Sequence, residues 1–104
     1  MKFLFARSAI LGFSALQALT AAWAADGKAV YEKSCALCHA QGVANAPRFG
    51  DPAAWAPRLA AGRPALVTSV IKGKGAMPPR AGVPGLKEAD IKSAVDFMLS
   101  AVRS

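Results

Sequence analysis

The chain has 104 residues, with 13 lysines and arginines against six aspartates and glutamates, so its formal net charge is +7. A domain of this size or smaller lies near the lower limit for a self-sufficient hydrophobic core and usually needs a disulfide, a metal or a bound cofactor. The only two cysteines are three positions apart, which excludes a disulfide framework and leaves a metal or a cofactor.

The first element in chain order is an N-terminal segment with the pattern of a secretory signal peptide. Lys2 and Arg7 give it a positive start, residues 8–19 are mostly apolar, and Ala22-Trp23-Ala24 ends it with small residues. This order of charge, apolar stretch and small residues is typical of a signal that is removed on export. We therefore predict cleavage after Ala24.

Cleavage divides the chain into a signal peptide, residues 1–24, and one mature domain, residues 25–104. The mature domain keeps a net charge of +5, because two basic residues leave with the signal. The alternative, an uncleaved membrane anchor, needs about 20 strongly apolar residues, whereas glycine, serine, glutamine and threonine interrupt this stretch. We expect a bacterial periplasmic protein without stable membrane insertion, whose charge favours acidic protein faces over nucleic acid as partners.

The next two elements are short helices with recognisable N-caps. Asp26 can cap a helix that runs to Cys35, because its carboxylate accepts from N–H groups that have no partner in the first turn. Asp51-Pro52 joins a cap residue to a proline at the first helical position. It opens a helix through Trp55, which we expect Pro57 to disturb.

Two further helices follow in the second half of the chain. Arg63-Pro64 opens the first of them, and glycines at 73 and 75 end it. The last helix has the clearest pattern, an apolar stripe at the helical period. Its members are Ile91, Ala94, Val95, Met98, Leu99 and Val102. It begins without a good cap residue, but Glu88 and Asp90 suit the positive end of the helix dipole.

Glycine- and proline-rich loops at 41–50 and 73–85 separate these helices. Long ordered loops in so small a domain usually serve a function such as wrapping a ligand. No run of β-branched or aromatic residues alternates with polar ones, so no strand is predicted. The expected fold class is all-α, with three to five helices wrapped around one bound group.

The sequence Cys35-Ala36-Leu37-Cys38-His39 has the pattern of covalent haem attachment. Two thiols three residues apart can reach the vinyl groups on neighbouring edges of one porphyrin and form thioether bonds. The next residue then lies under the ring, with its imidazole directed at the iron. We predict one haem c, bound covalently through Cys35 and Cys38, with His39 as an axial iron ligand.

Two other uses of paired cysteines are less favoured. A redox-active Cys-x-x-Cys of the thioredoxin type is expected within a βαβ pattern, which is missing here. A structural zinc site needs four nitrogen or sulfur ligands, and the chain offers two cysteines and one histidine. A lone histidine is ordinarily a surface or core residue, but this one directly follows the second cysteine.

The second axial ligand decides between electron transfer and ligand chemistry. The mature chain has two methionines, Met77 and Met98. Met98 belongs to the apolar stripe of the last helix, where methionine usually fills the core. Met77 lies in a loop between glycine and two prolines, and we predict that it is the second iron ligand.

The chain from Gly27 to Met98 resembles the class I cytochromes c, and most closely the bacterial cytochrome c5 group. The resemblance is carried by Gly27, Tyr31, the Cys-x-x-Cys-His motif, Gly42-Val43-Ala44-Asn45-Ala46-Pro47, Phe49-Gly50-Asp51, Trp55-Ala56-Pro57-Arg58, Lys72-Gly73-Lys74-Gly75-Ala76-Met77-Pro78-Pro79 and Ala94-Val95-Asp96-Phe97-Met98. Members of that group often have a second cysteine pair after the methionine loop, and residues 80–86 have none.

The resemblance implies roles for further residues. The carbonyl of Pro47 would accept the Nδ1 proton of the histidine ligand, a bond that orients a metal-binding imidazole. Trp55 and Arg58 would lie near a haem propionate and donate to it, although a plain core position for Trp55 is nearly as well supported. Gly27 and Tyr31 of the first helix would cross Ala94 and Phe97 of the last.

These observations predict a monomeric electron carrier rather than an enzyme. Two protein ligands would leave the iron no open position, and small apolar loop rims suit brief docking to redox proteins with acidic faces. The basic residues that could form a docking ring are Lys28, Lys33, Arg48, Arg58, Arg63, Lys72, Lys74 and Arg80. Two alternatives stay open: a haem subunit of a larger periplasmic oxidoreductase complex, and a haem enzyme or gas-binding protein.

Overall fold

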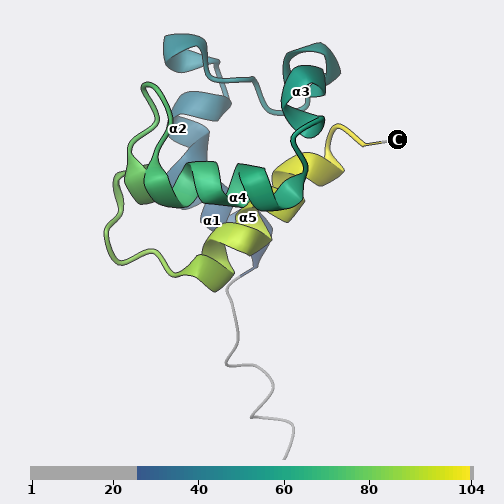
Figure 1. Cartoon of the computed structure of the whole chain (residues 1–104). Helices are drawn as coiled ribbons and strands as arrows, with labels where there is room; N and C mark the ends of the chain where they lie inside the picture. Colours follow the sequence, from purple (N-terminus) through teal and green to yellow (C-terminus); the bar gives the residue numbers. More distant parts are fainter. Residues whose placement is uncertain (1–25, 104) are drawn as a thin grey trace, which may run out of the picture.

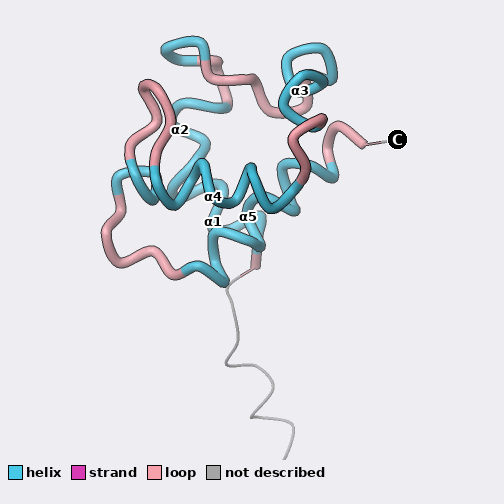
Figure 2. Tube along the Cα trace, viewed as in Figure 1, coloured by secondary structure: helices cyan, strands magenta, loops and turns pink. Residues whose placement is uncertain are grey.

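The computed structural model describes residues 26–103, so the predicted signal peptide lies outside the described residues. Four helical segments follow one another, and no strand occurs between residues 26 and 103 beyond an isolated bridge, so the all-α prediction is confirmed (Figures 1 and 2). The helical elements are α1 (Gly27–Val30), a π-helical turn (Tyr31–Cys35), α2 (Ala36–His39), a 3₁₀ turn (Val43–Asn45), α3 (Pro52–Leu59), α4 (Arg63–Lys72), a second 3₁₀ turn (Pro79–Gly82) and α5 (Glu88–Ser100).

The first segment, formed by α1, the π-helical turn and α2, is longer than predicted. It begins as expected, since the Asp26 carboxylate accepts the Ala29 N–H at 3.3 Å. It continues past Cys35 to His39, because the wider turn keeps the backbone hydrogen-bonded and Ala36 and Leu37 are strong helix formers. A single π-helical turn inside a helix is frequent at functional sites.

α1 crosses α5 at Gly27, the crossing that the resemblance implied (Figure 1). A Cβ at this position would overlap the Ser93 carbonyl oxygen and lie 3.2 Å from the Cβ of Phe97. One turn further along, the rings of Tyr31 and Phe97 are 5.6 Å apart and tilted. Glycine therefore allows the two backbones to approach closely enough for their aromatic side chains to meet.

The core is formed mainly by the apolar stripe of α5. Its five buried residues are Ile91, Ala94, Val95, Met98 and Leu99, as the periodicity predicted; Val102 lies past the end of the helix and is partly buried. Val67 of α4, Trp55 of α3 and Tyr31 of the π-helical turn complete the cluster. No polar or charged residue of the described range is fully buried.

α3 begins at Asp51, whose carboxylate accepts the Ala53 and Ala54 N–H groups at 3.1 and 3.3 Å. The helix runs through Pro57 to Leu59, further than the sequence suggested. Proline removes the hydrogen bond to the carbonyl four residues earlier, which belongs to the exposed Ala53 and is open to water. The single missing bond is therefore tolerated.

α4 packs across α5 and ends at Gly73, as predicted. An ion pair between Arg63 and Asp96 joins the start of α4 to α5, and this hydrogen bond lowers the pKa of the Asp96 carboxyl. The two loops contain the 3₁₀ turns. In Figure 2 the first loop runs across the top of the view towards α3, and the second lies at the left of the view. Within residues 26–103, none of the helices combines the length and the apolar composition that crossing a membrane requires.

Candidate functional site

The two cysteines and the histidine lie on one turn at the end of the first helical segment. Cys35 closes the π-helical turn, and Cys38 and His39 belong to α2. Residues three and four apart in a helix share a face, so both cysteines and the imidazole point to the same side. Leu37, between the cysteines, is directed away and is 85% exposed.

The environment of the Cys35 thiol does not favour redox exchange. Burial raises its pKa to about 11, so the free thiol stays protonated at neutral pH. Attack on a disulfide requires the thiolate. In addition, no cluster of three or more metal-ligating side chains occurs between residues 26 and 103.

His39 is oriented by the loop that follows it. Its Nδ1 lies 2.9 Å from the Pro47 carbonyl oxygen; since a carbonyl can only accept, Nδ1 carries the hydrogen and Nε2 keeps a free lone pair. The Phe49 N–H donates to the His39 carbonyl at 2.7 Å, and the Trp55 indole stacks at 5.8 Å from the imidazole. The bond to Pro47 that the resemblance implied is present, and it fixes the tautomer that metal binding requires.

Met77 lies at the end of a tight turn. Lys74 and Met77 exchange two backbone hydrogen bonds of 2.9 Å, with Gly75 at φ +58° between them. Gly73 holds this turn against the following prolines, because a Cβ there would lie 2.9 Å from the Pro79 nitrogen and 3.0 Å from the Met77 carbonyl oxygen. The turn therefore presents a half-buried thioether on a closely fixed backbone.

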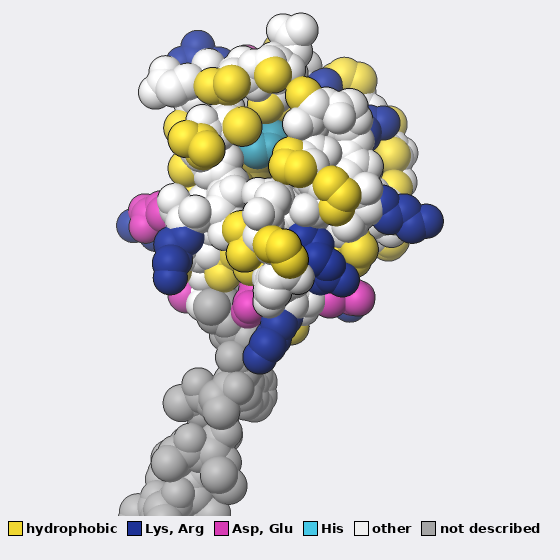
Figure 3. All heavy atoms as spheres, turned by 90° about the vertical axis from the view of Figure 1, so that its left-hand side faces the viewer, with side chains coloured by type: hydrophobic (Ala, Val, Ile, Leu, Met, Phe, Trp, Pro, Cys, Tyr) yellow, Lys and Arg dark blue, Asp and Glu magenta, His cyan; other side chains and the backbone are white. Residues whose placement is uncertain are grey.

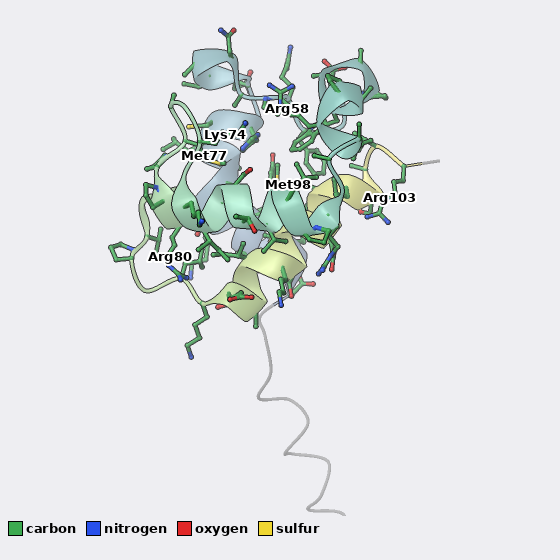
Figure 4. All side chains as sticks on the ribbon, viewed as in Figure 1. Arg58, Lys74, Met77, Arg80, Met98 and Arg103 are labelled. Atoms are coloured by element: carbon green, nitrogen blue, oxygen red, sulfur yellow. The ribbon has the colours of Figure 1, made fainter. Side chains whose placement is uncertain are left out.

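Met98 has a different environment. Its side chain is 6% exposed and belongs to the buried cluster with Ile91, Val95 and Leu99. Met98 belongs to α5, whereas Met77 lies on the loop beside Lys74 in Figure 4. The packing agrees with the prediction that Met98 fills the core.

Trp55 and Arg58, the two residues predicted to contact a haem propionate, both donate to backbone carbonyls in this structure. The Trp55 indole N–H donates to the Arg48 carbonyl at 2.9 Å, and the ring is 7% exposed. The Arg58 guanidinium donates to the Ala54 carbonyl at 2.7 Å. Trp55 therefore has the core position that the sequence analysis kept as an alternative, and both propionate contacts stay predictions.

The sequence did not indicate the exposure of Leu37 or the hydrogen bond of Arg80. Leu37 occupies a variable position of the motif, yet it is the most exposed large hydrophobic residue of the described range. Arg80 donates from Nη1 to the Leu86 carbonyl at 2.6 Å, although its sequence suggested only one more surface charge. The exposure of Leu37 depends on which surface of α2 stays uncovered, and the hydrogen bond of Arg80 depends on the path of its loop.

The residues present fit a covalently attached haem. Two thiols and a correctly oriented imidazole share one helical face, and the imidazole has a free nitrogen. In Figure 3 the chain's single histidine is visible in an opening bordered by hydrophobic side chains, with lysines and arginines further out. Such an apolar border suits the faces of a porphyrin.

Comparisons with known proteins agree with this arrangement. Residues 22–98 match a family model described as subunit III of cbb3-type cytochrome c oxidase. The chain is 48% identical to cytochrome c-555 of Chlorobaculum thiosulfatiphilum over 80 residues, which cover 73% of this chain and 93% of the relative. It is 36% identical to cytochrome c5 of Azotobacter vinelandii over 77 residues, or 72% and 93% of the two chains.

A solved structure is similar in both sequence and fold. It is described as the crystal structure of an electron transfer complex of nitrite reductase with cytochrome c. The match has a TM-score of 0.71 and 53% identity, and it covers 74% of this chain and 94% of the other.

Proposed function

Because this chain belongs to the mono-haem class I c-type cytochromes of the c-555, c-551 and c5 group, we propose that it transfers single electrons between redox proteins in the periplasm. Members of this group are electron carriers with one covalent haem c. We propose His39 and Met77 as the axial iron ligands. When bound, the haem supplies a one-electron ferric/ferrous couple.

The hydrogen bond from His39 Nδ1 to the Pro47 carbonyl carries this proposal. It fixes the imidazole with Nε2 available as a ligand, and a partner of this kind also raises the basicity of a metal-bound imidazole. Cys35 and Cys38 lie on the same helical face as His39, which supports thioether attachment of the haem at this face.

Met77 supports electron transfer rather than ligand chemistry. A thioether on a fixed turn would hold the second axial position, so that neither a substrate nor a gas could reach the iron without displacing it. Methionine opposite histidine also stabilises the ferrous state and raises the potential. The enzyme and gas-binding alternative lacks a comparable observation.

The face around Leu37 is the proposed docking surface for partners. Leu37 lies between the two cysteines and is 85% exposed, and Val43 of the neighbouring turn is 50% exposed. Small apolar contacts of this kind suit weak, short-lived electron-transfer complexes. Since the 53% identical cytochrome was solved with nitrite reductase, we propose a redox enzyme with an acidic docking face as partner.

An absorption spectrum with and without carbon monoxide tests the proposal. The purified, reduced holoprotein is expected to keep its spectrum under carbon monoxide for minutes, and to release one electron per chain in an oxidative titration. Rapid binding of carbon monoxide would favour the gas-binding alternative and contradict closed His/Met ligation.

The second candidate function is that of a fixed haem subunit in a larger oxidoreductase complex, because the matching family model is described as an oxidase subunit. The discriminating measurement is the size at which the native protein elutes from a periplasmic extract. A free carrier elutes as a small monomer, whereas a fixed subunit elutes with its complex.

A further inference from the structure

The loop that carries Met77 contains a run of left-handed backbone. Arg80 has φ +54° and Ala81 has φ +56°, and Gly82 follows at +80°. For a residue with a Cβ this conformation is costly, because the Cβ comes close to the following carbonyl oxygen. Two such residues in succession persist only where the surrounding contacts hold them.

The Arg80 side chain makes a hydrogen bond that spans the loop containing these left-handed residues. Its guanidinium Nη1 donates to the Leu86 carbonyl at 2.6 Å, and the side chain is half-buried. Backbone bonds from Ala81 to Pro78, from Val83 to Arg80 and from Leu86 to Val83, at 3.1, 2.9 and 2.9 Å, form the turns between. Among the described residues, this is the one side-chain hydrogen bond within the segment 78–86.

The segment 78–86 is directly coupled to the position of Met77. The Pro79 nitrogen and the Met77 carbonyl both lie against Gly73, where not even a Cβ would fit. A change in the path of the chain at 78–80 therefore moves the backbone that carries the thioether. Figure 4 shows Arg80 on the same loop as Met77, below it in that view.

We propose that Arg80 is a positioning residue for Met77, which holds the thioether at its place by tying residue 80 to the Leu86 carbonyl across the loop. This inference rests on the proposed function, since it requires Met77 to be an iron ligand. It also removes Arg80 from the set of freely solvated docking charges, because its guanidinium is engaged with the backbone.

The test measures how fast imidazole displaces Met77 from the ferric holoprotein. Replacing Arg80 by Met keeps most of the side-chain volume but removes the donor. We expect displacement to accelerate about tenfold or more, the factor that corresponds to ~1.4 kcal/mol and to the loss of a charge-assisted hydrogen bond. Arg80→Lys keeps a charged donor and is expected to fall between Arg80→Met and the wild type.

Arg103→Met is the matched control, because Arg103 lies at the other side of the molecule in Figure 4. It loses the same charge and should leave the displacement rate unchanged. Ile91→Val controls for general loss of stability, since Ile91 is 1% exposed and lies in the core on α5, outside the segment 78–86. If Ile91→Val accelerates displacement as much as Arg80→Met at an equal loss of melting temperature, Arg80 has no special role.

The same spectra separate the two proposals. If the ferric wild type shows no long-wavelength sulfur-to-iron band, or if Met77→Ala keeps it, the proposed ligation fails. If the band is present and depends on Met77, but Arg80→Met exchanges at the wild-type rate, only the positioning role is overturned.

Discussion

Met77 and Met98 offer the same thioether, so chemistry cannot choose between them and position has to. Met98 is 6% exposed among the buried residues of α5, and moving it to the iron would open a hole at the centre of the core. Met77 is half-buried on a turn closed by two hydrogen bonds. A fixed turn lowers the entropic cost of holding one side chain in place.

The first prediction follows at this scale. Met77→Ala should abolish the sulfur-to-iron band of the ferric protein, lower its reduction potential and allow carbon monoxide to bind rapidly. Met98→Leu should leave all three nearly unchanged, because it conserves volume and costs less than about 1.5 kcal/mol of stability. A band that survives in Met77→Ala and disappears in Met98→Leu would reverse the assignment.

Among the helices, the crossing of α1 and α5 determines where the attachment motif stands. The motif follows α1 within one continuous helical segment, so the place where α1 is fixed also fixes the cysteines and His39. Phe49 joins the crossing from the loop after the motif, with its ring 4.8 Å from Tyr31 and 5.3 Å from Phe97. The same aromatic cluster thus supports the helix crossing and the loop that orients the imidazole.

The second prediction concerns this crossing. Gly27→Ala would place a Cβ against the Ser93 carbonyl, so we expect a loss of about 1–3 kcal/mol from overpacking, measured as a lower melting temperature of the holoprotein. Gly85→Ala is the control, since no atom lies within 4 Å of its ideal Cβ and its φ is not in the left-handed region. Equal melting temperatures for the two variants would show that the helices can separate at no cost.

The domain as a whole has little core of its own. The buried hydrophobic residues of the described range are Val30, Tyr31, Trp55, Val67, Ile91, Ala94, Val95, Met98 and Leu99. Most of them belong to or contact α5, while the loops that carry Pro47 and Met77 contribute none. These loops therefore depend on the covalently bound haem for much of their stability, as expected for a domain near the lower size limit.

The third prediction is that the protein without haem loses its fold. In Cys35→Ala/Cys38→Ala, which cannot attach the group, circular dichroism should show a loss of native helix content and no cooperative melting. Native helix content with a sharp melting transition would mean that the core formed by α5 is sufficient by itself.

The surface charge of the whole molecule leads to the fourth prediction. Lys28 and Arg63 are in ion pairs with Glu32 and Asp96, which leaves Lys72 and other exposed basic residues to attract a partner. We expect electron exchange with an acidic redox enzyme to slow as ionic strength rises, because the Debye length falls to about 10 Å at 0.1 M.

Matched charge variants refine this measurement. Lys74→Gln, beside the Met77 loop, should reduce the salt dependence more than Lys92→Gln, whose lysine pairs with Glu88 on α5. An electron-exchange rate that stays constant from low to high ionic strength would show that electrostatic attraction does not contribute to docking.

By itself, the sequence determined the features that depend on neighbouring residues. The Asp26 and Asp51 caps, the end of α4 at Gly73 and the stripe of α5 follow from local hydrogen bonding and helical period, and the structure confirms them. The haem motif is equally local, because two thiols and an imidazole within five residues determine their own chemistry.

Only the tertiary structure decided what depends on the path of the loops. The hydrogen bond from Trp55 to the Arg48 carbonyl and the one from Arg80 to the Leu86 carbonyl both depend on loop paths that no periodicity records. Hydrogen bonds of this kind form where folding brings a donor and a carbonyl together, so residue type alone cannot assign them.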